Sequence, residues 1–472
     1  MNNSIIKNQR IFKSLSEFFY SKYYPVYLAL FTVFFYTAKI PMAGLVFYAL
    51  LSAITLISFR DLTPFMPLPM MIMMSFSDLV FFGNALSIIC MAILFISLVL
   101  HLMLYQIKKF KFGKLFFPII FVSVALFCGG LFSPYLSTYA NGLGSSLSVG
   151  LMIFIFYLLF TNYINTDTKM NYKNHYMYLL AVCGALISLE LIIHQYNTTF
   201  DASIKYEMGY GNTNIVASAL LVTLPSYCYF ICKNKNSVFC FVMLILCYSG
   251  IYLSHSDGAL AVSLAFAPIL ALIIYFNADK RKKVFYIKAV LIASAVAIVC
   301  LVLIATKRDL YAILLKYLDK VKTDNLRTGI YLHALDLFSK YPVFGVGLGY
   351  FAPGLNNPEE TGHVISYLFS FHSTFFHVIA TMGILGIIAY VIYYIARYKI
   401  ILGKNTLLNL TCYISFSMMQ IYGSIDGCEF HAFPILIYCT FMFIILEKHN
   451  KEKDNNLTLP LTKNILNYKT FN

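Results

Sequence analysis

His372 and Ser373 open an apolar run at residues 371–395, where a leucine would be cheaper to bury. A neutral histidine accepts a proton from a hydroxyl near neutral pH, and the guanidinium fork of an arginine suits phosphate oxygens. Arg327 supplies such a fork at the start of a predicted amphipathic helix. These groups fit transfer from a lipid-linked diphosphate to an acceptor hydroxyl. Cations would stabilise the leaving diphosphate while the base prepares the nucleophile, an effect of about 10²–10⁴-fold.

Further polar residues fall in segments expected on the same side of the membrane: Lys205, Asn212, Asn214, His255, Asp257, Asp426 and Glu429. Taken singly, each candidate has a simpler interpretation. Asn214 can be a helix cap, Arg327 can pair with Asp324, and His372 can anchor a helix at the interface. His377 follows His372 by five residues, which puts it on another helix face, so we expect it to serve packing.

The composition indicates what kind of protein must position these groups. Of 472 residues, 60% are hydrophobic and 12% charged, and the mean hydropathy is +0.74, outside the range of soluble domains. Apolar runs of about 17–23 residues recur, each long enough to cross the hydrocarbon core as a helix. The alternating pattern of a lipid-facing barrel is missing from these runs. The expected fold is therefore an all-α polytopic membrane protein.

The predicted spans, with edges uncertain by a few residues, are about 24–39, 42–59, 66–82, 85–105, 115–133, 146–164, 176–195, 214–232, 237–253, 258–276, 284–306, 371–395, 405–422 and 431–446. The third holds two prolines and Asp78, and a re-entrant hairpin there would reduce fourteen spans to twelve. We therefore expect about 12–14 transmembrane helices.

Basic residues predict the orientation, because short basic loops stay on the cytoplasmic side. Most of the 35 lysines and arginines fall on one side: the N-terminus, "KKFKFGK", "KNK", "DKRKK", "ARYKIILGK" and the tail. Short loops on the other side, such as "SHSDG" and "GSIDGCE", carry none. This places the N-terminus in the cytoplasm. Topology thus explains the net charge of +15 without a nucleic-acid partner.

One long connection, residues 307–370, separates two groups of spans on the extracytoplasmic side. It holds an amphipathic pattern from Arg327 to Lys340 and then the turn-rich "YPVFGVGLGYFAPG", so we expect a partly helical, folded loop. The predicted organisation is an N-terminal transmembrane bundle (1–306), this loop (307–370), C-terminal transmembrane helices (371–446) and a cytoplasmic tail (447–472). The eleven cysteines lie almost entirely in apolar runs, which predicts small core residues and no disulfide framework.

Two other functional classes fit less well. "GVGLGY" follows a helix and leads into none, so a turn is expected in place of a dinucleotide site, and no P-loop motif occurs in the sequence. Any reaction must then use a pre-activated substrate or a gradient. A gradient-driven transporter needs ionisable groups near the middle of the bilayer. Of the candidates Asp78, Glu190, His194, Lys288 and His101, only Asp78 is expected there, which weakens the transporter alternative.

The motifs in order resemble the superfamily of O-antigen ligases and O-antigen polymerases, which are bacterial membrane glycosyltransferases. That family has a histidine, then Asn, Ser or Gln, nine residues, and Gly-x-x-Gly, as here at His372, Ser373, Gly383 and Gly386. "RTGIYLHALDLFSKYPVFGVGLGYF" is similar to its arginine-led loop helix, and "GYGNTNIVASALLVTLP" to its Asn-led span. The chain differs where "SHSDG" replaces an arginine-containing turn and where Lys205 replaces a common arginine.

The resemblance implies a donor glycan on undecaprenyl diphosphate and a glycan acceptor at the outer leaflet of the bacterial plasma membrane. It implies an inverting reaction with no metal and no cofactor, and the outer loops carry no Asp-x-Asp pair for a divalent cation. Expected roles are His372 as base, Arg327 and Lys205 as diphosphate contacts, and Ser373 and Asn214 as positioning groups.

Asp257 is expected near the substrate, at the place of the family's arginine turn. Membrane lipid and polysaccharide-assembly proteins are the expected partners. A polymerase is preferred over a ligase that transfers finished polysaccharide to lipid A core, wall polymer or protein, because no outer loop suggests a dedicated acceptor domain. A polysaccharide or lipid exporter is the alternative from another class.

Overall fold

The computed structural model describes residues 16–72, 85–136, 140–166, 170–198, 213–233, 237–280, 283–288, 325–348, 371–430 and 435–452. Within these ranges the regular secondary structure is all helical, and no strand occurs. The helices before the long connection are α2 (Tyr23–Thr37), α3 (Pro41–Ser58), α4 (Pro67–Met71), α5 (Ala85–Leu104), α6 (Phe116–Leu131), α7 (Ala140–Tyr163), α8 (Tyr172–Asn197), α9 (Thr213–Lys233), α10 (Ser237–Leu253) and α11 (Asp257–Asn277). The later ones are α14 (Asn325–Lys340), α16 (Thr374–Ile401), α17 (Leu407–Gly423), the 3₁₀ turn η5 (Cys428–Phe430) and α18 (Ile435–Lys451).

Seven of these helices are long and apolar enough to cross a membrane, and α2, α6 and α10 are shorter apolar helices. The predicted all-α membrane architecture is confirmed. Most observed bounds agree with the predicted spans to within a few residues, but α7 begins at Ala140, α16 continues to Ile401 and α18 continues to Lys451. Most of the predicted span 284–306 lies outside the described residues. Within the predicted span 66–82, the described part is only the short helix α4 and the turn before it, and Asp78 lies outside the described residues.

Local sequence explains where several helices begin. Pro41 starts α3, because proline is tolerated where its missing N–H has no helical partner. Asn171 caps α8 by accepting a hydrogen bond from the Asn174 backbone N–H at 3.2 Å, and Thr406 caps α17 in the same way. These polar caps stand at the ends of apolar runs, so the runs become separate helices.

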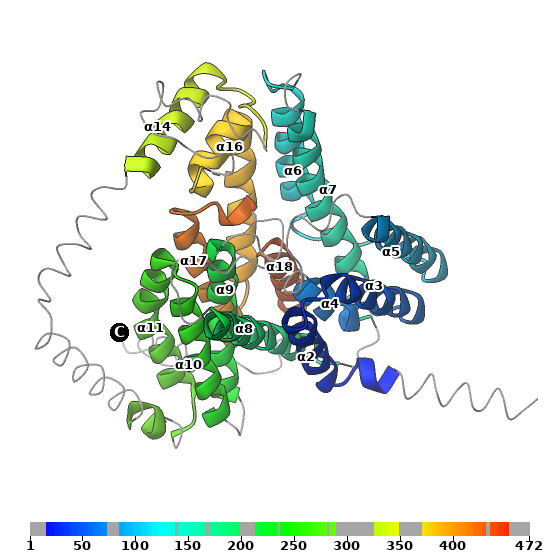
Figure 1. The fold of residues 1–472 in the computed structure, drawn as a ribbon, viewed down its shortest axis with the longest axis vertical. Helices are drawn as coiled ribbons and strands as arrows, with labels where there is room; N and C mark the ends of the chain where they lie inside the picture. The colour runs from blue at the N-terminus through cyan, green and yellow to red at the C-terminus, as the bar shows by residue number, and fades with distance from the viewer. Residues whose placement is uncertain are drawn as a thin grey trace, which may run out of the picture.

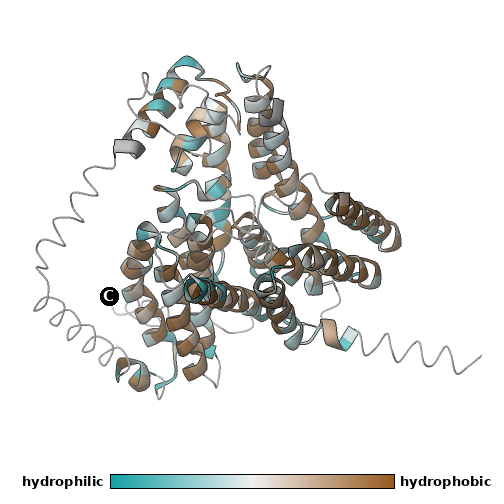
Figure 2. Ribbon diagram, in the orientation of Figure 1, coloured by the Kyte–Doolittle hydropathy of each residue, from teal (hydrophilic) through white to brown (hydrophobic). Residues whose placement is uncertain are grey.

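Helix α9 occupies the centre of one half of the bundle, surrounded by α8, α10, α11 and α17 (Figure 1). Of its membrane-length window, 89% of the residues are buried inside the protein, against 22% for α5, which packs mainly on α3. Figure 2 shows apolar residues along the outward faces of the bundle, as expected where lipid is the solvent. The polar loops gather at the ends of the helices.

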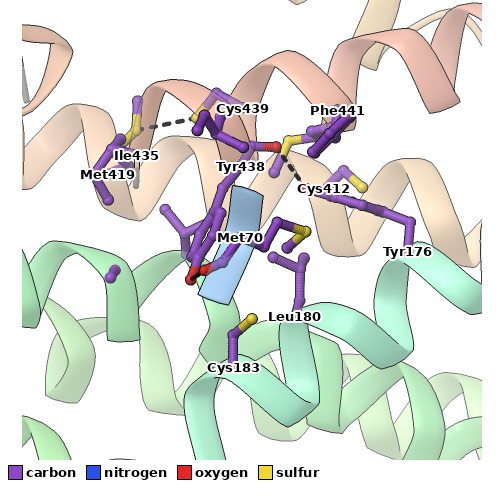
Figure 3. Packing of buried hydrophobic residues seen from close by; sticks show 14 of the residues in the cluster. Met70, Tyr176, Leu180, Cys183, Cys412, Met419, Ile435, Tyr438, Cys439 and Phe441 are labelled. Atoms are coloured by element: carbon purple, nitrogen blue, oxygen red, sulfur yellow. Dashed lines mark hydrogen bonds between the residues drawn. The ribbon is translucent and has the colours of Figure 1, made fainter. Parts of the chain in front are cut away.

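Aromatic and sulfur-containing side chains fill the central core where α8, α17 and α18 meet the short α4 (Figure 3). Tyr438 donates a hydrogen bond to the carbonyl of Met70 at 3.0 Å, and Tyr176 donates to the carbonyl of Tyr438 at 2.9 Å. Of the cysteines whose side chains are described, all are free and all but Cys128 are buried. The prediction of core cysteines is confirmed for these residues.

Candidate functional site

Helix α16 begins at the site predicted from the histidine motif, and the structure explains the residues there. Ser373 occupies the cap position in an extended conformation, and its carbonyl accepts the backbone N–H of His377 at 2.9 Å. The preceding His372 has φ +43°, a left-handed conformation that few side chains adopt. This turn holds the imidazole at the helix start. Strained backbone of this kind is common at functional sites.

Three elements that are far apart in the sequence meet at His372. Its Nδ1 lies 3.5 Å from Oδ1 of Asp426, in the segment after α17, and the Asp426 side chain is 3% exposed. Tyr331 of α14 donates a hydrogen bond to the His372 carbonyl at 3.0 Å, and Figure 1 shows α14 beside the start of α16. The His372 imidazole therefore faces a nearly buried carboxylate, while the loop helix binds the backbone of the same residue.

The motif glycine Gly383 breaks α16 with φ +59° and ψ −150°. Residues 341–347 dock along this break. The N–H groups of Val346 and Gly347 donate to the carbonyls of residues 380 and 381 at 2.9 Å. Beyond the break, Ile384 and Leu385 donate to the carbonyls of residues 342 and 343 at 2.8 and 3.2 Å. The described part of "GVGLGY", residues 345–348, is thus a turn bound to α16, as its position after a helix predicts.

Close backbone approach accounts for the glycines in this seam. A Cβ at Gly383 would lie 2.5 Å from the Pro342 carbonyl oxygen. On α6, a Cβ at Gly129 would lie 2.4 Å from the Thr381 carbonyl oxygen. The second motif glycine, Gly386, has no room for a Cβ because Met382 Cβ would lie 2.3 Å away. The two motif glycines therefore shape the backbone behind His372 and touch no reacting group.

The turn before α11 stands next to the segment that carries Asp426. Ser256 Oγ lies 2.9 Å from Tyr422 Oη, and the Tyr422 carbonyl accepts the Asp426 N–H at 3.0 Å. A Cβ on Gly258 would meet Ile425 at 2.5 Å, so the two elements are in direct contact. Asp257, at the first position of α11, is thereby brought to the same end of the bundle as Asp426.

The remaining predicted site residues are located less completely. Arg327 lies in the first turn of α14, four residues before Tyr331, and only its backbone is described. Asn214 is the second residue of α9 and is half-buried. Lys205 lies outside the described residues. The expectation that Arg327 and Lys205 lie close to His372 therefore stays a prediction.

The structure corrects the placement of Arg397. The sequence assigns it to the basic loop segment "ARYKIILGK" after the predicted span, but it lies within α16, its side chain is 1% exposed, and Nη1 lies 3.1 Å from the Glu429 carboxylate. Its guanidinium carbon lies 3.9 Å from the ring centre of Tyr393 and 4.8 Å from that of Phe416. Glu429, predicted only as one of several outer polar groups, is the partner of this buried cation. Its carboxylate, in a short loop that carries no lysine or arginine, was the available signal.

The comparison with protein families tests the resemblance. Residues 241–391 match the family model described as O-Antigen ligase (Wzy_C). The chain carries an O-antigen ligase family domain. This domain extends from α10 into α16, so it includes Arg327, the turn segment 341–347, His372 and both motif glycines. Helix α9 and the Asp426 segment lie outside the matched range. A comparison with curated proteins gave no match.

Proposed function

We propose that this membrane protein transfers a glycan from undecaprenyl diphosphate to an acceptor sugar hydroxyl at the outer leaflet, as an O-antigen or surface-polysaccharide polymerase. The observation that carries the proposal is the imidazole of His372, a residue of the O-antigen ligase family domain in contact with the loop helix α14, facing the Asp426 carboxylate. A histidine held by a carboxylate is the arrangement of a general base.

The chemistry follows from the two ring nitrogens. When Nδ1 carries the proton that faces Asp426, Nε2 is the unprotonated nitrogen and accepts the proton of the acceptor hydroxyl. The acceptor oxygen then bonds to the anomeric carbon while the bond from that carbon to the diphosphate oxygen breaks, with inversion. Asp426 stabilises the imidazolium that forms. Arg327 and Lys205 stabilise the departing diphosphate, and Ser373, Asn214 and Asp257 position the substrates.

Purified protein in proteoliposomes, supplied with a fluorescent undecaprenyl-diphosphate oligosaccharide, tests the proposed function. A polymerase converts this single substrate into a ladder of longer lipid-linked glycans. A ligase gives one capped product and only when lipid A core, a wall polymer or a protein acceptor is added. An exporter moves the label across the membrane without forming a glycosidic bond. The ligase result would correct the subtype, and transport without bond formation would overturn the enzyme.

Asp426→Asn should lower kcat by about 10–100-fold, because the amide keeps the size of the side chain but no longer stabilises a charged imidazolium. Initial rates of ladder formation measure the effect. Asp336→Asn is the matched control, since Asp336 forms an exposed ion pair with Lys340 on α14 and should leave the rate unchanged. Equal rates for Asp426→Asn and the unmodified protein would remove Asp426 from the mechanism.

A further inference from the structure

The segment that carries Asp426 is built as a tight turn, residues 424–430. The Tyr422 carbonyl accepts the N–H groups of both Ile425 and Asp426 at 3.0 Å, and Asp426 Oδ1 accepts the Gly427 N–H at 2.8 Å. The Phe430 N–H then bonds to the Gly427 carbonyl at 3.0 Å. These bonds fix the shape of the turn. Separate contacts are needed to hold the turn against α16.

A buried ion pair provides that attachment. Glu429 accepts hydrogen bonds from Arg397 of α16 and from Gln420 of α17, so one carboxylate joins two helices to the turn. The exposed fractions of the Arg397 and Glu429 side chains are 1% and 6%. Stacking of the guanidinium against Tyr393 and Phe416 restricts it further. A charge buried this deeply is stable only while its partner is in place.

The turn contacts α16 at three levels, on both sides of the break at Gly383. Asp426 faces His372 at the helix start, and the Phe430 ring stacks on His377 with ring centres 4.1 Å apart. Beyond the break, Glu429 binds Arg397. Because Asp426 and Glu429 are only three residues apart, a shift at the Arg397 end displaces the carboxylate at the His372 end.

We propose that Arg397 and Glu429 are a positioning pair that holds the 424–430 turn on α16 and so keeps Asp426 in register with His372. The inference rests on the proposed function, in which His372 is the base. Neither residue touches the substrate; both act through Asp426. Misplacement of a catalytic group by about 1 Å costs up to about 10²-fold in rate.

The first test is Glu429→Gln, which keeps the bond to Gln420 and removes the charge that binds Arg397. We expect kcat for ladder formation to fall about 10–100-fold while KM for the lipid-linked donor changes less than about twofold, since the donor contacts are untouched. A rise in KM with kcat unchanged would overturn the inference, because it would make the pair part of donor binding.

The double variant Arg397→Met with Glu429→Gln separates positioning from simple stability. Glu429→Gln alone leaves the Arg397 charge buried without its partner and should lower the unfolding temperature in detergent. The double variant has no such charge, so its unfolding temperature should be close to that of the unmodified protein. The turn still lacks its attachment to α16, so kcat should stay low. Recovery of kcat together with the unfolding temperature would mean that the pair only stabilises the fold, which contradicts the proposal.

A destabilising control lies elsewhere in the bundle. Tyr157 of α7 donates a buried hydrogen bond of 2.5 Å to Glu447 of α18, and Tyr157→Phe removes it. This variant should lower the unfolding temperature without lowering kcat at a permissive temperature. An equal fall in kcat for Tyr157→Phe would contradict a specific role for the pair.

His372→Ala, measured in parallel, distinguishes failure of the proposed function from failure of the positioning pair. If His372→Ala keeps full activity, the proposed function fails first. If His372→Ala is inactive and Glu429→Gln keeps the kcat of the unmodified protein, the positioning pair alone is refuted.

Discussion

His372→Ala should lower glycan transfer by about 10²–10⁴-fold, the contribution of a positioned general base. The substitution removes the only group proposed to accept the proton of the acceptor hydroxyl. The side chain is 13% exposed, so alanine leaves a mostly buried gap beside Asp426 and lowers the unfolding temperature, while Ser373 stays in the N-cap position of α16. We therefore expect normal insertion, and the rate is measured at a temperature at which the variant is folded. The fluorescent ladder assay measures the transfer rate. Binding of the lipid-linked donor to the purified variant measures whether the donor site is intact.

The control for this variant is another histidine that the mechanism does not use. His194 is half-buried in the last turn of α8, and His194→Ala should keep the transfer rate within about twofold, as substitutions away from special features usually do. Ladder formation by His372→Ala at the rate of the unmodified protein would end the assignment of the base.

Gly383→Ala should have the largest effect on folding. A residue with a Cβ at φ +59° costs about 1–3 kcal/mol from conformation alone. The added carbon would also lie 2.5 Å from the Pro342 carbonyl oxygen and 2.6 Å from the backbone of Val343, and no rotamer relieves a contact with backbone. We expect a total loss of about 3 kcal/mol or more in the free energy of unfolding, with loss of transfer. Thermal unfolding in detergent and the yield of folded protein measure it.

Gly144→Ala is the matched glycine control. Gly144 lies in α7, where an added Cβ meets no atom within 4 Å, so alanine should be neutral or stabilise by up to about 1 kcal/mol. If Gly383→Ala unfolds at the same temperature as Gly144→Ala, the docking of residues 341–347 on the broken helix is not what fixes this part of the fold.

Most of the described helices, and the grouping of the histidine motif, could be predicted from the sequence. Long apolar runs separated by polar caps predict spans because lipid demands complete backbone hydrogen bonding, and this requirement is local. The histidine motif likewise groups His372, Ser373, Gly383 and Gly386, which the structure locates just before α16, at its N-cap, at its break and in the turn after the break. The motif can be found from the sequence because its residues all lie within one short segment, residues 372–386.

Contacts between distant segments could not be predicted in the same way. Asp426 and Glu429 stood out as carboxylates in an apolar region, but nothing local specifies that the turn folds back onto α16. The error for Arg397 has a clear physical cause. Counting basic residues treats every cation as a solvated loop residue, whereas a carboxylate and several aromatic rings let this one stay buried.

The break at Gly383 also makes the second half of α16 depend on a segment that precedes it in the chain. Ile384 and Leu385, just beyond the break, donate to the carbonyls of residues 342 and 343, because the broken helix does not supply their usual acceptors. Lipid offers no substitute for these acceptors. A fragment beginning at Phe371 would therefore lack the carbonyls that complete the hydrogen bonding of this helix.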